Sequence, residues 1–277
     1  MSQPPAQRHV LRIVVVLYGT APDQSLTLET LQLASRSNED FVGEIVVWDN
    51  SPQSFGAASL NGLSFPGFSV KYMACPENLA LSKVYNNVAA GIATGHFLIL
   101  DQDSQLPADY FSVLRSQLDA HPAQDLFLPV VLSSGRCVSP GELWYFKGRH
   151  LASPRQGQQR SRRMLAITSG MVIRSAYLQE PRFDERLSLY GIDTRFMLDY
   201  ADSGRSVVVM PIVLGHDTAL WSDISADRML GRVQTLVRSW PIVFEKRPFA
   251  RLLARCHARL MLLKLAIKYR DPRFLFA

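Results

Sequence analysis

The stretch that decides the fold reads His96-Phe97-Leu98-Ile99-Leu100-Asp101-Gln102-Asp103-Ser104. Its apolar half is typical of a strand buried on both faces of a parallel sheet. Asp101 and Asp103 follow at the predicted carboxyl end, where open α/β sheets bind their ligands. Two such carboxylates suit Mg²⁺ or Mn²⁺, which leave positions open for substrate phosphates. The stretch therefore predicts a site for a metal-bound diphosphate, although Asp-x-Asp-Ser is also a good turn and helix cap.

Strand-like runs alternate with helical patterns on both sides of this stretch. The predicted strands are residues 13–18, 44–49, 69–73, 97–101, 126–132 and 207–214. The predicted helices are residues 26–35, with Asp23 and Ser25 as possible caps, 80–93, 108–118 and 191–203. This order predicts an α/β fold with a mostly parallel, doubly wound sheet flanked by helices.

Composition narrows the class of protein. The chain has 277 residues, 47% of them hydrophobic, and can bury a large core. Its cysteines, Cys75, Cys137 and Cys256, lack Cys-x-x-Cys spacing, which argues against a zinc site or a disulfide framework and favours a cytoplasmic protein. The apolar run at 13–18 is too short for a signal-peptide core or a membrane span.

One internal segment shows no regular pattern. Residues 135–163 are rich in Gly, Pro, Ser, Gln and basic side chains, and we predict a mobile basic loop whose part at 149–163 follows Trp144 and Tyr145. Such a loop could close over a ligand, and the alternative is an ordinary surface insertion.

The C-terminal segment holds the excess positive charge. Between Lys246 and Arg270 there are eight Lys or Arg and no acid, which leaves 22 basic against 24 acidic residues elsewhere. We therefore divide the chain into a domain at 1–240 and a basic amphipathic helical extension at 241–277. Such a helix predicts peripheral binding to an anionic membrane surface. The alternatives are packing on the rest of the chain or in a homodimer. Nucleic acid is disfavoured because the basic stretches are not interleaved with the aromatic residues that stack on single strands.

Several motifs fall in a familiar order. They are Val16-Leu17-Tyr18, Val47-Trp48-Asp49-Asn50-Ser51, Glu77-Asn78-Leu79-Ala80-Leu81-Ser82-Lys83-Val84-Tyr85-Asn86, Leu100-Asp101-Gln102-Asp103-Ser104, Thr168-Ser169-Gly170-Met171 and Tyr190-Gly191-Ile192-Asp193-Thr194-Arg195-Phe196. In their order and spacing the chain resembles the inverting family-2 glycosyltransferases of the GT-A fold, especially bacterial rhamnosyltransferase-like members, over roughly residues 10 to 240.

The resemblance implies roles on the donor side. Asp49 would accept the imide N–H of a uracil or thymine ring, and Tyr18 would pack against the base. Asp103 would ligate Mg²⁺ or Mn²⁺, while Asp101 would contact the ribose or orient the metal ligands. For Asp49 the alternative is structural, because Asp-Asn-Ser-Pro is a strong turn sequence.

It also implies a catalytic base and a third metal contact. Asp193 would take the proton from the acceptor hydroxyl, although Asp is also favoured in any first helical turn. His216 would contact the metal or the diphosphate, or would be an ordinary hydrogen-bonded strand-end residue. The remaining residues assigned to nucleotide-sugar binding are Asn78, Lys83, Asn86, Gln102, Ser169 and Gly170. For Lys83 and Asn86, solvated helix positions are the alternative.

The function expected from the resemblance is a metal-dependent inverting glycosyltransferase of bacterial surface-polysaccharide or lipopolysaccharide synthesis. Its donor would be a dTDP- or UDP-sugar, such as dTDP-rhamnose, and its acceptor a hydroxyl of a glycan or a lipid-linked molecule. Two alternatives stay open: a non-catalytic protein that binds nucleotide and docks on a membrane or partner, and a haloacid-dehalogenase-type phosphatase. A nucleotidyltransferase is disfavoured because no Gly-rich basic loop follows the first strand.

Overall fold

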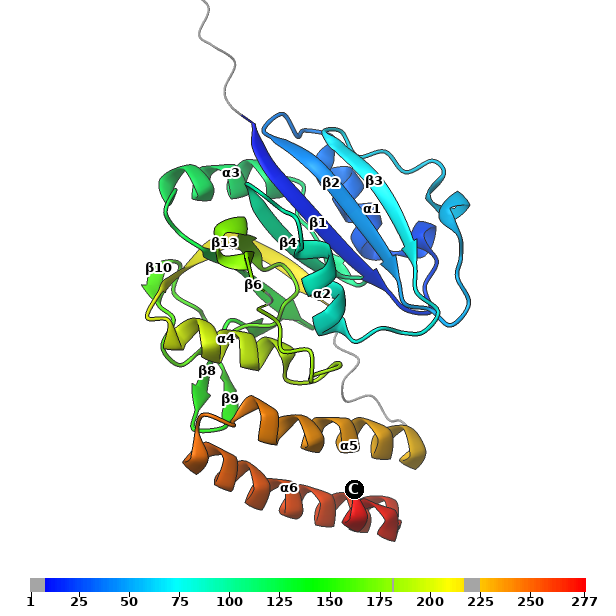
Figure 1. Cartoon of the computed structure of the whole chain (residues 1–277), viewed down its shortest axis with the longest axis vertical. Helices are drawn as coiled ribbons and strands as arrows, with labels where there is room; N and C mark the ends of the chain where they lie inside the picture. Colours follow the sequence, from blue (N-terminus) through cyan, green and yellow to red (C-terminus); the bar gives the residue numbers. More distant parts are fainter. Residues whose placement is uncertain (1–7, 181, 217–224) are drawn as a thin grey trace, which may run out of the picture.

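The structure is a computed structural model that describes residues 8–180, 182–216 and 225–277, and a large sheet forms its centre (Figure 1). In sheet order the strands are β10 (Gly157–Arg160), β13 (Ser206–His216), β6 (Leu126–Ser133), β12 (Val172–Arg174), β4 (His96–Asp101), β1 (His9–Leu17), β2 (Phe41–Asp49) and β3 (Phe68–Ala74), with β5 (Ser104–Gln105) on β13 and β7 (Arg136–Ser139) on β6.

The sheet is mixed and mostly parallel, as predicted. The long pairings β4–β1, β1–β2, β2–β3 and β13–β6 are parallel. The short strand β12 lies antiparallel between β4 and β6 and joins the two parallel parts. The predicted strands at 13–18, 44–49, 69–73 and 97–101 are confirmed, each with a start one to four residues earlier than expected.

Helices cover both faces of the sheet. In Figure 1, α2 (Leu81–Ala89) and α4 (Ile192–Asp202) lie over one face, and α1 (Leu26–Ser35) and α3 (Tyr110–Ala120) lie over the other. Side chains of β1 alternate between two cores: Val14 and Val16 pack on the α2–α4 side, and Ile13 and Val15 on the α1–α3 side. Burial on both faces explains the apolar runs seen in the sequence. The predicted cap Ser25 is confirmed, since its hydroxyl accepts from the Leu28 amide.

The prediction of an irregular loop within 135–163 is wrong. This segment contains β7, β8 (Gly141–Trp144), β9 (Lys147–His150) and β10, and β8 pairs with β9 and with β11 (Met164–Leu165) in a small second sheet. Every residue of β9 is exposed, so no alternation of polar and apolar residues marks it as a strand. Strand β10 finds its backbone partners on the edge of β13, a tertiary pairing that local sequence does not reveal.

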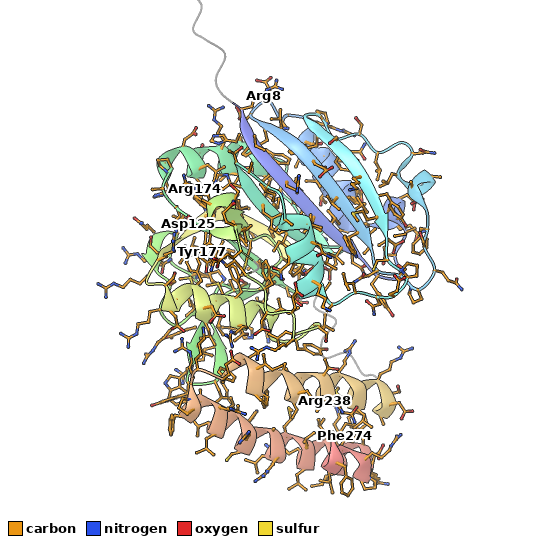
Figure 2. All side chains as sticks on the ribbon, in the orientation of Figure 1. Arg8, Asp125, Arg174, Tyr177, Arg238 and Phe274 are labelled. Carbon is orange, nitrogen blue, oxygen red and sulfur yellow. The ribbon has the colours of Figure 1, made fainter. Side chains whose placement is uncertain are left out.

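The C-terminal part is a pair of helices, α5 (Ala226–Val243) and α6 (Pro248–Tyr269), which run in opposite directions (Figure 1). The predicted boundary at 240 therefore falls inside α5. Phe274, from the short helix η5 (Pro272–Phe276), fills the space between α5 and α6 (Figure 2). Other single-turn helices are η1 (Pro22–Gln24), η2 (Ala57–Leu60) and η3 (Ser175–Leu178). Among the described helices, none combines the length and the apolar character needed to cross a bilayer.

Candidate active site

A cleft of about 960 Å³ opens at the carboxyl ends of β1 and β4. Seven of the predicted site residues line it: Tyr18, Asn78, Asp101, Gln102, Asp103, Asp193 and His216. The prediction that strand ends and the start of α4 meet in one place is therefore confirmed in its geometry.

The turn that carries the two aspartates is held by the start of α1. The Thr27 amide donates to the Gln102 carbonyl oxygen at 3.3 Å, and the Thr27 hydroxyl donates to the Asp101 carbonyl oxygen. On the other side, the Tyr18 amide donates to the Gln102 side-chain oxygen at 2.7 Å. Two carbonyl groups of the turn are thus paired with α1, and Asp101 and Asp103 line the cleft.

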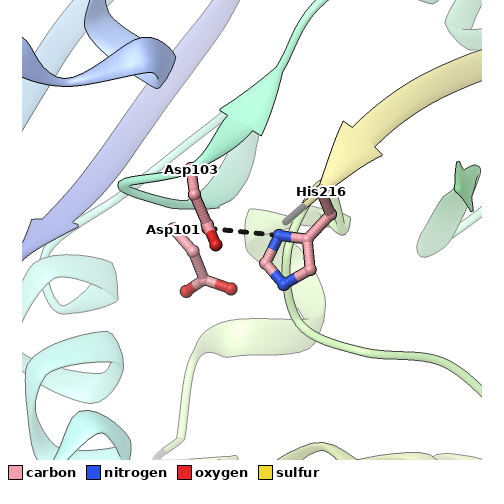
Figure 3. Close-up of side chains that lie close together, drawn as sticks. All are labelled: Asp101, Asp103 and His216. Carbon is pink, nitrogen blue, oxygen red and sulfur yellow. Dashed lines mark ion pairs between the residues drawn. The ribbon is translucent and has the colours of Figure 1, made fainter. Parts of the chain in front are cut away.

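His216 reaches this turn because of a strand pairing. Strand β5 directly follows Asp103 and pairs with the end of β13, which places His216 opposite Ser104. The His216 Nδ1 atom lies 3.2 Å from an Asp103 oxygen (Figure 3). One ligand atom each of Asp101, Asp103 and His216 fits within 4.8 Å. Two carboxylates and an imidazole at this spacing match the donor set of a divalent cation.

The pKa of Asp101 is raised to about 6, mainly by burial, with the charge of His216 lowering it and the charges of Asp103 and Asp193 raising it. The cleft thus concentrates negative charge beside a carboxyl that resists ionisation. A bound cation would offset the free-energy cost of ionising Asp101 beside the other acids. The residues present therefore fit a metal ion.

The raised pKa of Asp101 has a consequence for stability. Because the folded state binds this proton more tightly than the unfolded state, Asp101 costs stability as the pH rises from about 4 through 6. We expect Asp101→Asn to raise the free energy of unfolding by about 2 kcal/mol at pH 8 without divalent cations, with a gain that shrinks toward pH 4. Urea unfolding of both proteins at several pH values measures this, and a variant that is less stable at pH 8 would contradict it.

Asp193 lies on the same cleft, in the first turn of α4. Burial raises its pKa, although the Thr194 amide, which donates to its Oδ1 at 2.6 Å, acts in the opposite direction. Tyr85 also lines the cleft, and its buried hydroxyl hydrogen bonds with Thr168 in the electric field of Asp101 and Asp193. Because its pKa is raised by burial, the carboxylate of Asp193 is more basic than that of a solvent-exposed aspartate.

Two predicted nucleotide contacts lie away from the cleft. The Asn86 side chain donates to the Phe183 carbonyl oxygen at 2.8 Å and accepts from the Phe183 amide at 3.2 Å. It therefore links α2 to the segment that leads into α4. Lys83 is exposed on α2 and is not among the lining residues. Lys83 is thus a solvated helix position, whereas Asn86 is half-buried and has a structural role that neither interpretation predicted.

Asp49, the predicted acceptor for a base, is fully buried and does not line the cleft. Its oxygens accept from the Ser51 amide at 2.9 Å, the Phe55 amide at 3.1 Å and the Tyr72 hydroxyl. Burial alone would raise the pKa of Asp49, but these hydrogen bonds hold it below its usual value. In this arrangement the carboxylate shapes a turn, and a base has no access to it.

Ser169 and Gly170 pack beside the strand end that carries Asp101, outside the cleft. The Ser169 hydroxyl accepts from the Asp101 amide at 3.4 Å. Gly170 has a φ of +82°, and a Cβ atom there would lie 2.4 Å from Leu214. Neither lines the cleft, so their predicted contact with nucleotide sugar is absent from the described structure.

Sequence reasoning missed several lining residues. Tyr85, Thr168, Tyr190, His150 and Thr235 also face the cleft. The first three lie inside the quoted motifs, and their place in those motifs could have identified them from the sequence. His150 comes from β9 and Thr235 from α5. No local motif predicts that these two elements pack beside the cleft.

No protein-family model and no curated protein sequence matches the chain. Solved structures do match: S. aureus TarS 1–349 with UDP-GlcNAc (TM-score 0.51, 15% identity) and S. aureus TarS 1–349 (TM-score 0.50, 14% identity). Each alignment covers 83% of this chain, and 66% and 65% of those chains. The fold is GT-A. At such identities the likeness shows the fold alone, and the chain spans about 39% of the longer TarS structure.

Proposed function

We propose that this protein is a metal-dependent inverting glycosyltransferase that moves a sugar from a UDP- or dTDP-sugar to a hydroxyl of a glycan or lipid-linked acceptor. One observation carries the proposal: the ligand atoms of Asp101, Asp103 and His216 fit within 4.8 Å and line the same cleft as Asp193. The likeness to TarS bound to UDP-GlcNAc supports the donor class.

On the donor side, Tyr18 offers a ring that is 53% exposed beside Gln102, and a base can pack on it. Asp101, Asp103 and His216 would hold Mg²⁺ or Mn²⁺. When bound, this ion neutralises the diphosphate, on which negative charge grows as the sugar leaves.

On the acceptor side, Asp193 takes the proton of the attacking hydroxyl. The hydroxyl oxygen bonds to the anomeric carbon as the bond to the diphosphate breaks on the opposite face, which inverts the configuration. The raised pKa of Asp193 makes its carboxylate a better base than an ordinary surface aspartate.

The proposal is tested by release of nucleoside diphosphate. We expect purified protein with Mn²⁺ or Mg²⁺ to release UDP or dTDP from at least one donor in a set that includes dTDP-rhamnose and UDP-GlcNAc. Release with GDP-mannose should be slower, because the likeness to a structure that binds UDP-GlcNAc favours a pyrimidine-nucleotide donor. Chelation of the metal should abolish release, and readdition should restore it.

Three other results would contradict the proposal. Tight nucleotide binding without release from any donor, with or without glycan and lipid acceptors, would favour a non-catalytic binding protein. Phosphate release from a simple phosphomonoester would favour a phosphatase. Full activity after chelation would show that the reaction does not require a metal ion.

A further inference from the structure

Helix α6 has apolar side chains on two opposite sides. Ala250, Ala254, Ala258 and Leu262 are buried, and Leu262 packs with Met229 and Val233 of α5. Another set is exposed: Phe249 59%, Leu252 56%, Leu260 60%, Leu263 48% and Ile267 69%. One side of α6 therefore packs on the rest of the chain, which was one of the alternatives for this helix. The other side is left uncovered.

The exposed residues form one continuous stripe. Phe249, Leu252, Cys256, Leu260, Leu263 and Ile267 follow each other at three- and four-residue steps, which keeps them within about a third of the helix circumference. We call these six residues the α6 stripe. A row of large apolar side chains facing solvent indicates a binding surface.

Basic residues border the α6 stripe on both sides. At 100° per residue, Arg255 and Arg259 fall along one border, and Lys264 and Lys268 along the other. All four are exposed, and α6 contains no acid. In the part of the chain that the structure describes, Arg255, Arg259 and Lys264 form no ion pair, so their charges are available to a partner.

Aromatic residues continue the surface beyond the helix. Trp144 at the end of β8 and Tyr145 in the turn that follows are 47% and 53% exposed. The Tyr145 ring centre lies 5.6 Å from that of Phe249. Trp and Tyr are the side chains that concentrate at the boundary between lipid headgroups and acyl chains.

A shallow groove of about 450 Å³ runs beside the stripe. It is lined by Leu260, Met261 and Leu265, by His257, and by the two cations Lys147 and Lys264. A groove lined by apolar side chains and by cations suits an acyl chain that carries a phosphate group.

We propose that the α6 stripe lies in the surface of a membrane that contains anionic lipids. The apolar residues would enter the acyl boundary, and the two basic borders would face the lipid phosphates. A second copy of the chain fits less well, because pairing two stripes brings one basic border against another.

This docking does not depend on the proposed function, but it narrows the acceptor. Helix α5 packs on α6 and contributes Thr235 to the wall of the cleft. Docking through α6 therefore holds the cleft near the lipid surface. If the proposed function holds, the acceptor class is a lipid-linked hydroxyl.

Sedimentation of the full chain with vesicles tests the inference. We expect binding to phosphatidylcholine vesicles that contain phosphatidylglycerol, and weak binding to phosphatidylcholine alone. The triple variant Leu260→Gln, Leu263→Gln, Ile267→Gln should bind at least about tenfold more weakly, because it loses three apolar side chains that the wild type would bury in the lipid. The matched control, Leu33→Gln with Val70→Gln, replaces residues of α1 and β3 that are 45% and 39% exposed and should bind as the wild type does.

The charge is tested separately. Arg255→Gln and Arg259→Gln should each weaken binding to the anionic vesicles about fivefold, and high salt should remove that difference. Circular dichroism and thermal unfolding establish that each variant is folded.

Two results would overturn the inference: wild-type protein that ignores anionic vesicles at low salt, or a triple variant that binds as wild type does. A wild-type dimer that the triple variant converts to monomer would instead assign the stripe to a second copy. Donor hydrolysis without vesicles tests the proposed function alone, so the two failures are distinguishable.

Discussion

Asp193→Asn is expected to lower turnover by about 10²- to 10⁴-fold while donor affinity changes by less than about twofold. Asn has the same size, and its carbonyl oxygen can still accept the hydrogen bond that the Thr194 amide gives to Asp193 at 2.6 Å. It cannot take a proton, however, so the acceptor hydroxyl would attack without a base. Steady-state kinetics and calorimetric titration of the donor measure the two quantities.

Asp227→Asn is the matched control, because Asp227 also lies in the first turn of a helix and is not among the residues that line the cleft. It should leave turnover unchanged. Asp193→Asn should not unfold the protein, since the charge it removes is buried and costs stability. A silent Asp193→Asn variant with intact nucleotide binding would move the base elsewhere or favour a non-catalytic protein.

The parts of the fold that the sequence predicted are those that local pattern determines. Strand β1 is buried on both faces, so its residues form an unbroken apolar run, and α1 begins with a capping serine. Strand β12 is different: it has three residues and gains its place from partners on both sides, β4 and β6. Such a strand carries little signal of its own, so the mixed part of the sheet could not be located in advance.

The candidate site divides in the same way. One rule, that parallel strands present their carboxyl ends at one edge, predicted that Asp101, Asp103 and His216 would lie at the same edge of the sheet. The pairing of β5 with β13 then sets His216 opposite Ser104. The burial of Asp49 could not be predicted from this rule. It depends on Tyr72 of the neighbouring strand β3, whose hydroxyl donates to the carboxylate. His150 was missed for a related reason, since it belongs to a strand that we had predicted to be a loop. Motifs thus predict the groups at strand ends, while the groups that close around them come from tertiary contacts.

The metal-binding role is tested most sharply at Asp103. Asp103→Asn is expected to lower turnover by about 10²- to 10³-fold, and to raise the Mn²⁺ concentration for half-maximal activity at least about tenfold, because it removes a full negative charge from the cation site. Donor binding should weaken less than turnover falls, since the charge on the diphosphate is greatest in the transition state.

The geometry also predicts an order among the ligands. His216 lies 3.2 Å from Asp103 and brings no negative charge, so His216→Ala should affect turnover less than Asp103→Asn does. Asp109→Asn is the control, because Asp109 is exposed at the start of α3, makes no side-chain cap there, and is not among the residues that line the cleft. Activity measured across a Mn²⁺ titration separates these variants. If Asp103→Asn kept the metal dependence of the wild type, the dication would have to be bound outside the Asp101, Asp103 and His216 cluster.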